Sequence, residues 1–146
     1  MKKWLIIELL FVAILVAPTA YHGRVAANET EDLKTQLGTI RAAMSIYYGD
    51  MQGKYPDTLE TVLKNSKYMS SRPQAIAVYA NVPGRGVMRV HTREDMMKVR
   101  NFGSMKQADD RGGWGYVNDP SSPDYGLVFI NCTHREVRRK MVWKEL

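Results

Sequence analysis

The fold of this chain is decided by a stretch that reads ETEDLKTQLGTIRAAMSIYYGDM over residues 29–51. Six of its apolar residues recur at steps of three and four positions, a spacing that puts them on one face of an α-helix. Tyr55 and Pro56 end this pattern, because the residue before a proline disfavours helical backbone angles. We expect a small sheet to bury the first five members of this apolar stripe, which consists of Leu33, Leu37, Ile40, Met44, Tyr47 and Met51.

An apolar run, WLIIELLFVAILVA, precedes this helix at residues 4–17 and follows Lys2 and Lys3. The run is shorter than the roughly 20 residues that cross a bilayer unaided, and continuing it to Tyr21 brings it closer to that length. Lysines before an apolar segment mark the cytoplasmic side of a membrane. We therefore predict a long helix over residues 4–53, embedded in a membrane to about residue 21.

Glu8 lies inside this apolar run. A carboxylate at bilayer depth costs on the order of a few kcal/mol, so such a group usually has a partner and a function. Ordinary secretion signals have no use for an acidic residue at this depth. Glu8 is therefore the first candidate functional residue.

The rest of the chain, residues 54–146, is predicted to form a small globular domain. A short helix is expected at residues 58–65, with Asp57 as the N-cap residue that accepts its first free amides. Alternating apolar residues between turn-forming residues predict four strands. The fold class is α+β, with one long N-terminal helix packed on a small antiparallel sheet. The predicted strands span residues 75–80, 86–91, 114–117 and 126–131.

The last two predicted strands form a hairpin that is rich in aromatic residues. Trp114 and Tyr116 share one face of the first strand, and Leu127 and Phe129 share one face of the second. We expect these four side chains to meet against the long helix. We also expect Trp143 to fold the basic C-terminal tail back onto the domain.

Three segments match a known sequence pattern. The string IIELL at residues 6–10 follows a short basic leader, and Glu8 comes four residues after the aromatic Trp4. The string IYYGDMQGKYPDTL at residues 46–59 combines a helix end with a Tyr-Pro turn, and GGWGY at residues 112–116 opens the last hairpin. Together these segments resemble the type IV pilins and the pseudopilins of type II secretion.

The resemblance implies a structural filament subunit of a type IV pilus or a type II secretion pseudopilus, and not an enzyme. It implies a single-pass inner-membrane protein whose C-terminal domain lies in the periplasm or in an extracellular filament. The implied partners are the protein itself or other pilin-like subunits, the inner-membrane assembly platform and a prepilin peptidase. In that family the glutamate matched by Glu8 pairs with the N-terminal amine of a neighbouring subunit. The leader, here residues 1–3, is removed, and the first mature residue, here Trp4, is N-methylated.

Lys3 departs from the family pattern, which has a glycine before the cleavage site. A peptidase site that accepts glycine has little room for a long cationic side chain, so Lys3 is expected to slow or prevent cleavage. An uncleaved, signal-anchored periplasmic accessory protein is therefore an alternative. A secreted protein cleaved near residues 25–27 is another, against which Glu8 and Arg24 argue.

A basic cluster near the C-terminus supports a third alternative, a DNA-binding minor pilin. The chain is basic overall, with a formal charge of +6 and a pI near 9.5. Clustered cations attract phosphates or anionic lipid, but a solvated tail is the commoner explanation, so nucleic acid is not the expected partner. The cluster consists of Arg135, Arg138, Arg139 and Lys140.

Residues that bind metals show no local pattern. His22, His91 and His134 are far apart in the sequence, so we expect neither a metal ligand nor a catalytic residue among them. The single cysteine, Cys132, excludes an intramolecular disulfide and is expected to be buried. The resemblance admits calcium as a cofactor near the last hairpin, and no other cofactor is expected. The acids in that region match no ion-binding loop and are better explained as solvated turn residues: Asp109, Asp110, Asp119 and Asp124.

Overall fold

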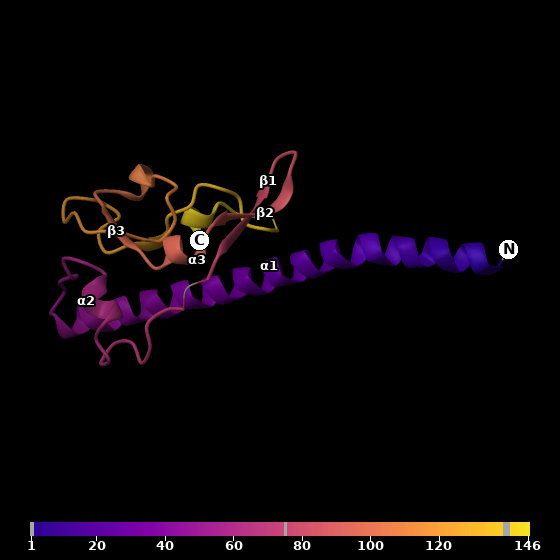
Figure 1. Ribbon diagram of the computed structural model, residues 1–146. Helices are drawn as coiled ribbons and strands as arrows, with labels where there is room; N and C mark the ends of the chain where they lie inside the picture. Colours follow the sequence, from indigo (N-terminus) through magenta and orange to yellow (C-terminus); the bar gives the residue numbers. More distant parts are fainter. Residues whose placement is uncertain (1, 75, 139–140) are drawn as a thin grey trace.

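The computed structural model describes residues 2–74, 76–138 and 141–146, with the backbone alone for residues 2–22. One long helix is followed by a small domain of short strands and helical turns, so the chain is α+β as expected (Figure 1). The elements in chain order are α1 (Lys2–Asp50), α2 (Glu60–Leu63), β1 (Val78–Val82), β2 (Gly86–His91), α3 (Arg93–Met96), β3 (Val99–Phe102), the 3-10 turn η1 (Met105–Gln107), β4 (Trp114–Val117), β5 (Val128–Ile130) and the 3-10 turn η2 (Trp143–Glu145).

The apolar stripe of α1 forms one side of the core. Its first four members are each at most 3% exposed, which confirms that part of the prediction. Tyr47 packs half-buried against the core, whereas Met51 lies beyond the end of α1 and is exposed. The stripe also begins earlier than expected, because Ala26 and Thr30 are buried at the same helical spacing. The Thr30 hydroxyl is satisfied within the helix, since it donates to the Ala26 carbonyl at 2.7 Å.

The strands form two sheets instead of one antiparallel sheet. β1 and β2 pair as an antiparallel hairpin, and β3, β4 and β5 form a second sheet in that order. Within the second sheet, β3 runs parallel to β4 and β5 runs antiparallel to it. Parallel neighbours need a crossover connection, which residues 103–113, including η1, supply here. The prediction of a purely antiparallel sheet is therefore wrong for β3, whose residues carried no clear strand pattern.

The register of β4 and β5 corrects the prediction for the last hairpin. Trp114 lies opposite Ile130 and Tyr116 lies opposite Val128, and these two pairs belong to the core against α1. Phe129 lies opposite Gly115 on the other face, where a Cβ at position 115 would come within 2.4 Å of the Phe129 ring. Opposed residues share a face, so the partners of Trp114 and Tyr116 were predicted one position out of register.

The segment between α1 and α2 is held by β4 and not by a helix cap. α2 has Leu59 as its N-cap residue, without a side-chain hydrogen bond, so the prediction of Asp57 as the cap is wrong. Instead, the Tyr116 hydroxyl donates to the Pro56 carbonyl at 2.6 Å, and the Asn118 amide donates to the Asp57 carbonyl at 3.1 Å. These two bonds fix the turn after α1 to the second sheet.

The C-terminal tail folds back onto the domain, as expected for Trp143. The Trp143 ring is fully buried, and its indole nitrogen donates to the Tyr79 carbonyl at 2.8 Å. Arg41 of α1 donates to the carbonyls of Val128 and Leu146, at 2.9 and 2.7 Å. These bonds hold the helix, β1, β5 and the tail together.

Candidate functional site

The predicted assembly and processing residues fall in the N-terminal half of α1. In Figure 1 the domain lies along the C-terminal half of this helix, and the N-terminal half continues beyond the domain. The helical backbone includes Lys3, Trp4 and Glu8, whose side chains lie outside the described part of the structure. Among the residues that were described, no helix combines the length and the apolarity needed to cross a membrane.

The structure describes two residues of the basic cluster near the C-terminus, and their contacts differ. Arg135 is exposed, and its carbonyl accepts a hydrogen bond from the Asn81 amide of β1. The Arg138 guanidinium lies 3.6 Å from the Glu31 carboxylate of α1, so part of its charge is balanced. Arg139 and Lys140 lie outside the described residues.

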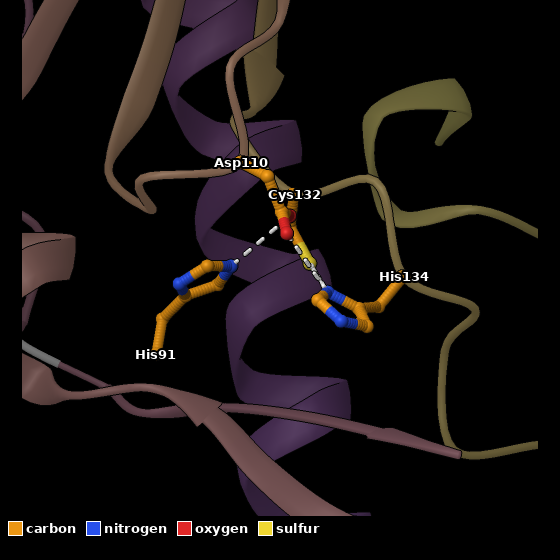
Figure 2. Close-up of side chains that lie close together, drawn as sticks. All are labelled: His91, Asp110, Cys132 and His134. Atoms are coloured by element: carbon orange, nitrogen blue, oxygen red, sulfur yellow. Dashed lines mark hydrogen bonds and ion pairs between the residues drawn. The ribbon is translucent and has the colours of Figure 1, made fainter. Parts of the chain in front are cut away.

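Four potential metal ligands from three separate segments converge on one point of the domain (Figure 2). His91 is the last residue of β2, and Asp110 lies in the loop between η1 and β4. Cys132 and His134 follow β5, two and four residues after its end. One ligand atom from each of the four residues lies within 4.8 Å of the others. Within the described chain this is the one group of three or more such side chains that could hold a metal ion.

The side chains of this His-Asp-Cys-His cluster lie close together, at distances between 3.3 and 3.7 Å. His91 Nε2 lies 3.5 Å from Asp110 Oδ1, and His134 Nδ1 lies 3.3 Å from Asp110 Oδ2. Cys132 Sγ lies 3.7 Å from His134 Nδ1. His91 and Cys132 are buried, whereas the Asp110 and His134 side chains retain 30% and 36% exposure, so one side of the cluster is open to solvent.

The backbone around the cluster is arranged so that the loop approaches His91. Asp110 adopts a φ of 60°, a left-handed conformation that aspartate tolerates better than most residues. Gly112 has a φ of 72°, and a Cβ at that position would lie 3.0 Å from His91 Cγ. The Thr133 amide donates to Asp110 Oδ1 at 2.7 Å and orients the carboxylate. The loop is therefore held against both β2 and the segment after β5.

Burial and hydrogen bonding set the charge states in the cluster. Burial lowers the pKa of His91, although Asp110 acts in the opposite direction. Burial raises the pKa of the Cys132 thiol to about 12. Burial also acts to raise the pKa of Asp110, but the Thr133 amide and the two histidines outweigh it and leave that pKa below its usual value. At neutral pH the cluster thus contains a carboxylate, a thiol and a neutral, buried imidazole.

The other three acids near the last hairpin accept hydrogen bonds and lie outside the cluster. The Asp109 carboxylate accepts from the Asn131 side-chain amide at 2.7 Å, and Asp119 accepts from the Ser121 hydroxyl at 2.7 Å. Asp124 accepts from the Ser104 hydroxyl and the Met105 amide. The Asp119 contact lies within its own turn, as expected, whereas the bonds of Asp109 and Asp124 reach Asn131 and Ser104, which are 22 and 20 positions away in the sequence. Asp110 differs from them because it faces two histidines and a cysteine.

Comparisons with protein-family models, with curated proteins and with solved structures returned no match. The choice of candidate residues is therefore supported by the sequence and the structure of this chain alone. Sequence reasoning selected Glu8 because a charge interrupts an apolar run. It missed the His-Asp-Cys-His cluster because the ligands are brought together by the fold. One local signal was present, because Cys132 and His134 are two potential ligands placed two residues apart directly after a predicted strand.

Proposed function

We propose that this chain is a structural subunit of a type IV pilus or a type II secretion pseudopilus. The observation that carries the proposal is α1, a helix of 49 residues whose C-terminal half is covered by the domain while its N-terminal half extends beyond it (Figure 1). At about 1.5 Å per residue such a helix is about 70 Å long, which is far more than a small domain can cover. The uncovered half needs other surroundings, either lipid or further copies of the same helix.

The sequence of the uncovered half supports this function. Residues 4–17 are apolar apart from Glu8, so the helix can be stored in the inner membrane and can pack against neighbouring helices after assembly. A carboxylate in such surroundings is costly unless a cation pairs with it. The N-terminal amine of a neighbouring subunit is a suitable partner, and this pairing would set the register between subunits. The partners of the chain are then pilin-like subunits and the inner-membrane assembly platform.

Assembly of Glu8→Ala in the source organism tests the proposal. The variant is expected to enter the membrane fraction normally and to be absent from sheared filaments, or from cross-linked oligomers in a secretion system. Asp32→Ala is a matched control, because it removes an exposed carboxylate from the covered half of the same helix. Assembly of Glu8→Ala at the level of wild type would overturn the proposal.

A second candidate function, a membrane-anchored periplasmic accessory protein, is favoured by Lys3 at the expected cleavage site. Without cleavage no free amine forms at Trp4, and Glu8 lacks its expected partner unless the Lys3 ammonium replaces it. Mass spectrometry of the N-terminus separates the candidates. A methylated chain that begins at Trp4 supports the filament subunit, an intact leader supports the anchored protein, and a chain that begins at Asn28 supports a secreted protein.

Processing of the Lys3→Gly variant tests whether lysine at this position prevents cleavage of the leader. If lysine blocks the peptidase, the glycine variant is processed more completely than wild type in a host that has the peptidase. Equal and complete processing of both chains after residue 3 would mean that the peptidase tolerates lysine. The chain would then be an ordinary filament subunit.

A further inference from the structure

We propose that His91, Asp110, Cys132 and His134 bind one divalent transition-metal ion, with Zn²⁺ as the best-suited ion, and that the ion ties β2, the loop before β4 and the segment after β5 together (Figure 2). This inference is independent of the filament function, because none of these residues lies in α1.

The first support is the spacing of the ligand atoms. In a tetrahedral zinc site with metal–ligand bonds of about 2.0–2.3 Å, neighbouring ligand atoms lie about 3.3–3.8 Å apart. The separations in the cluster are 3.3 Å from His134 Nδ1 to Asp110 Oδ2, 3.5 Å from His91 Nε2 to Asp110 Oδ1 and 3.7 Å from Cys132 Sγ to His134 Nδ1. These three contacts have the length of an edge of a coordination tetrahedron, and one ligand atom from each of the four residues lies within 4.8 Å of the others. The two histidines approach different oxygens of Asp110, so the carboxylate turns one oxygen toward the ion when the ion binds.

The second support is the buried nitrogen of His91. This residue is 6% exposed, and its Nε2 atom has no hydrogen-bond partner among the described residues. Buried polar atoms are nearly always satisfied, and leaving one unsatisfied costs roughly 1–3 kcal/mol. Nε2 faces the oxygen of Asp110, so an ion between them would be coordinated by the nitrogen lone pair and by the carboxylate.

The chemical nature of the four ligand groups indicates which metal ions the site can bind. Two imidazoles, one sulfur and one carboxylate are suited to Zn²⁺ and similar transition metals, whereas Ca²⁺ and Mg²⁺ prefer oxygen ligands alone. The Thr133 amide already orients the Asp110 carboxylate, as outer-shell groups do in metal sites. Cys132 would bind as the thiolate and release its proton to solvent.

Four protein ligands leave no open coordination position, so the site is structural and not catalytic. The half-buried side chains of Asp110 and His134 provide the path by which the ion enters. An ion bound here joins segments that are distant in the sequence. Because the unfolded chain does not hold the ligands together, binding stabilises the folded domain.

A metal titration of the full-length chain tests the proposal. Untagged protein is purified in a mild detergent, freed of metal with a chelator and titrated with Zn²⁺ or Co²⁺. We expect one ion per chain, a higher unfolding midpoint with Zn²⁺, and with Co²⁺ the strong visible bands of a tetrahedral site together with a thiolate-to-cobalt charge-transfer band. An excess of Ca²⁺ should leave the cobalt spectrum unchanged.

Cys132→Ser and His134→Gln are the ligand variants, and His22→Gln is the matched control. Loss of a ligand should weaken Zn²⁺ binding by at least roughly 10- to 100-fold, the loss typical of removing even an outer-shell partner. Cys132→Ser should also lose the charge-transfer band, while His22→Gln should behave as wild type. His134 is half-buried, so its variant should keep the fold even where replacement of the buried Cys132 does not.

Either of two binding results would overturn the site, and one competition result would overturn the kind of metal. One is a wild-type chain that binds less than one ion at saturation. The other is equal Zn²⁺ affinity in wild type and a folded ligand variant, which would mean that the metal binds elsewhere. Displacement of Co²⁺ by Ca²⁺ would overturn the choice of a transition metal.

Discussion

The two halves of α1 belong to one continuous helix but differ in what lies against them. In the C-terminal half, Leu33, Leu37 and Ile40 are buried by the hairpin β1–β2 and by β5. The N-terminal half extends past the domain (Figure 1). Most of the stability of a helix comes from packing of its apolar face, so the two halves depend on different partners. The covered half is stabilised by its own domain, and the uncovered half by whatever surrounds it outside the domain.

Two ion pairs join the first turns of the covered half of α1 to the domain. Glu29 pairs with Arg93 after β2. Five residues later, Lys34 Nζ lies 3.7 Å from the carboxylate of the buried Glu136 in the tail. These ion pairs thus lie among the first buried residues of the covered half, Ala26, Thr30 and Leu33. Substitutions on either side of this boundary should therefore have different effects on the domain.

The largest difference is expected for the two tryptophans Trp114 and Trp4. Trp114 is 3% exposed in the core, so Trp114→Ala should destabilise the domain by about 3–5 kcal/mol and could unfold it. Trp4→Ala removes the same side chain from the uncovered half and should leave the unfolding of the domain unchanged. Thermal unfolding followed by near-ultraviolet circular dichroism measures both variants. A folded Trp114→Ala domain of wild-type stability would show that the core does not depend on this ring.

A smaller difference is expected for a single methyl group. Ile40 is fully buried against the sheets, and Ile40→Val should lower the free energy of unfolding of the domain by about 0.5–1.5 kcal/mol. Ile14→Val makes the same change in the uncovered half and should have no effect on the domain. Chemical denaturation in detergent gives the two values. Equal losses in both variants would mean that the two halves unfold as one unit.

The smallest effect is expected at the C-terminal end of α1, where the Asp50 carboxylate lies 2.8 Å from Lys67 Nζ. A hydrogen bond to Lys67 lowers the pKa of Asp50, and the same bond raises the pKa of Lys67. The contribution of Asp50 is present above its unfolded pKa and is lost as the pH falls through the lower folded value. The contribution of Lys67 is present below its unfolded pKa and is lost as the pH rises through the higher folded value.

The pair therefore stabilises the fold between about pH 4 and about pH 10. Both groups are solvated, so the effect is small. Wild type should have a slightly higher unfolding midpoint than Asp50→Asn at neutral pH, and the two midpoints should converge in acid. A difference that grows as the pH falls would contradict this assignment.

The helix was predictable because its signal is local. The period of three and four residues identifies Leu33 to Met44 without any knowledge of the partner surface. Met51 was placed wrongly on the stripe because the helix stops at Asp50, where Gln52 and Gly53 take positive φ angles. The face of Phe129 was wrong for a different reason. Strand register depends on the pairing of β4 with β5, and an error of one position moves a side chain to the opposite face.

The His-Asp-Cys-His cluster could not be predicted from spacing. Its residues come from the end of β2, from a loop with three left-handed residues and from the segment after β5. They meet because the β4–β5 pairing brings the loop and the last segment to the same end of the sheet. The parallel β3–β4 pairing, which the sequence did not predict, also fixes where that loop begins.

The close approach of Gly112 to the His91 ring has a consequence for how related sequences can vary. A Cβ at position 112 would lie 3.0 Å from His91 Cγ and 3.1 Å from Asp95 Cβ, in a backbone conformation with φ of 72° that favours glycine. Both the space and the backbone angle thus oppose any larger residue while histidine occupies position 91. Chains that descend from the same ancestor should therefore retain the glycine wherever they retain the histidine, and an alanine at 112 should be accompanied by a smaller side chain at 91.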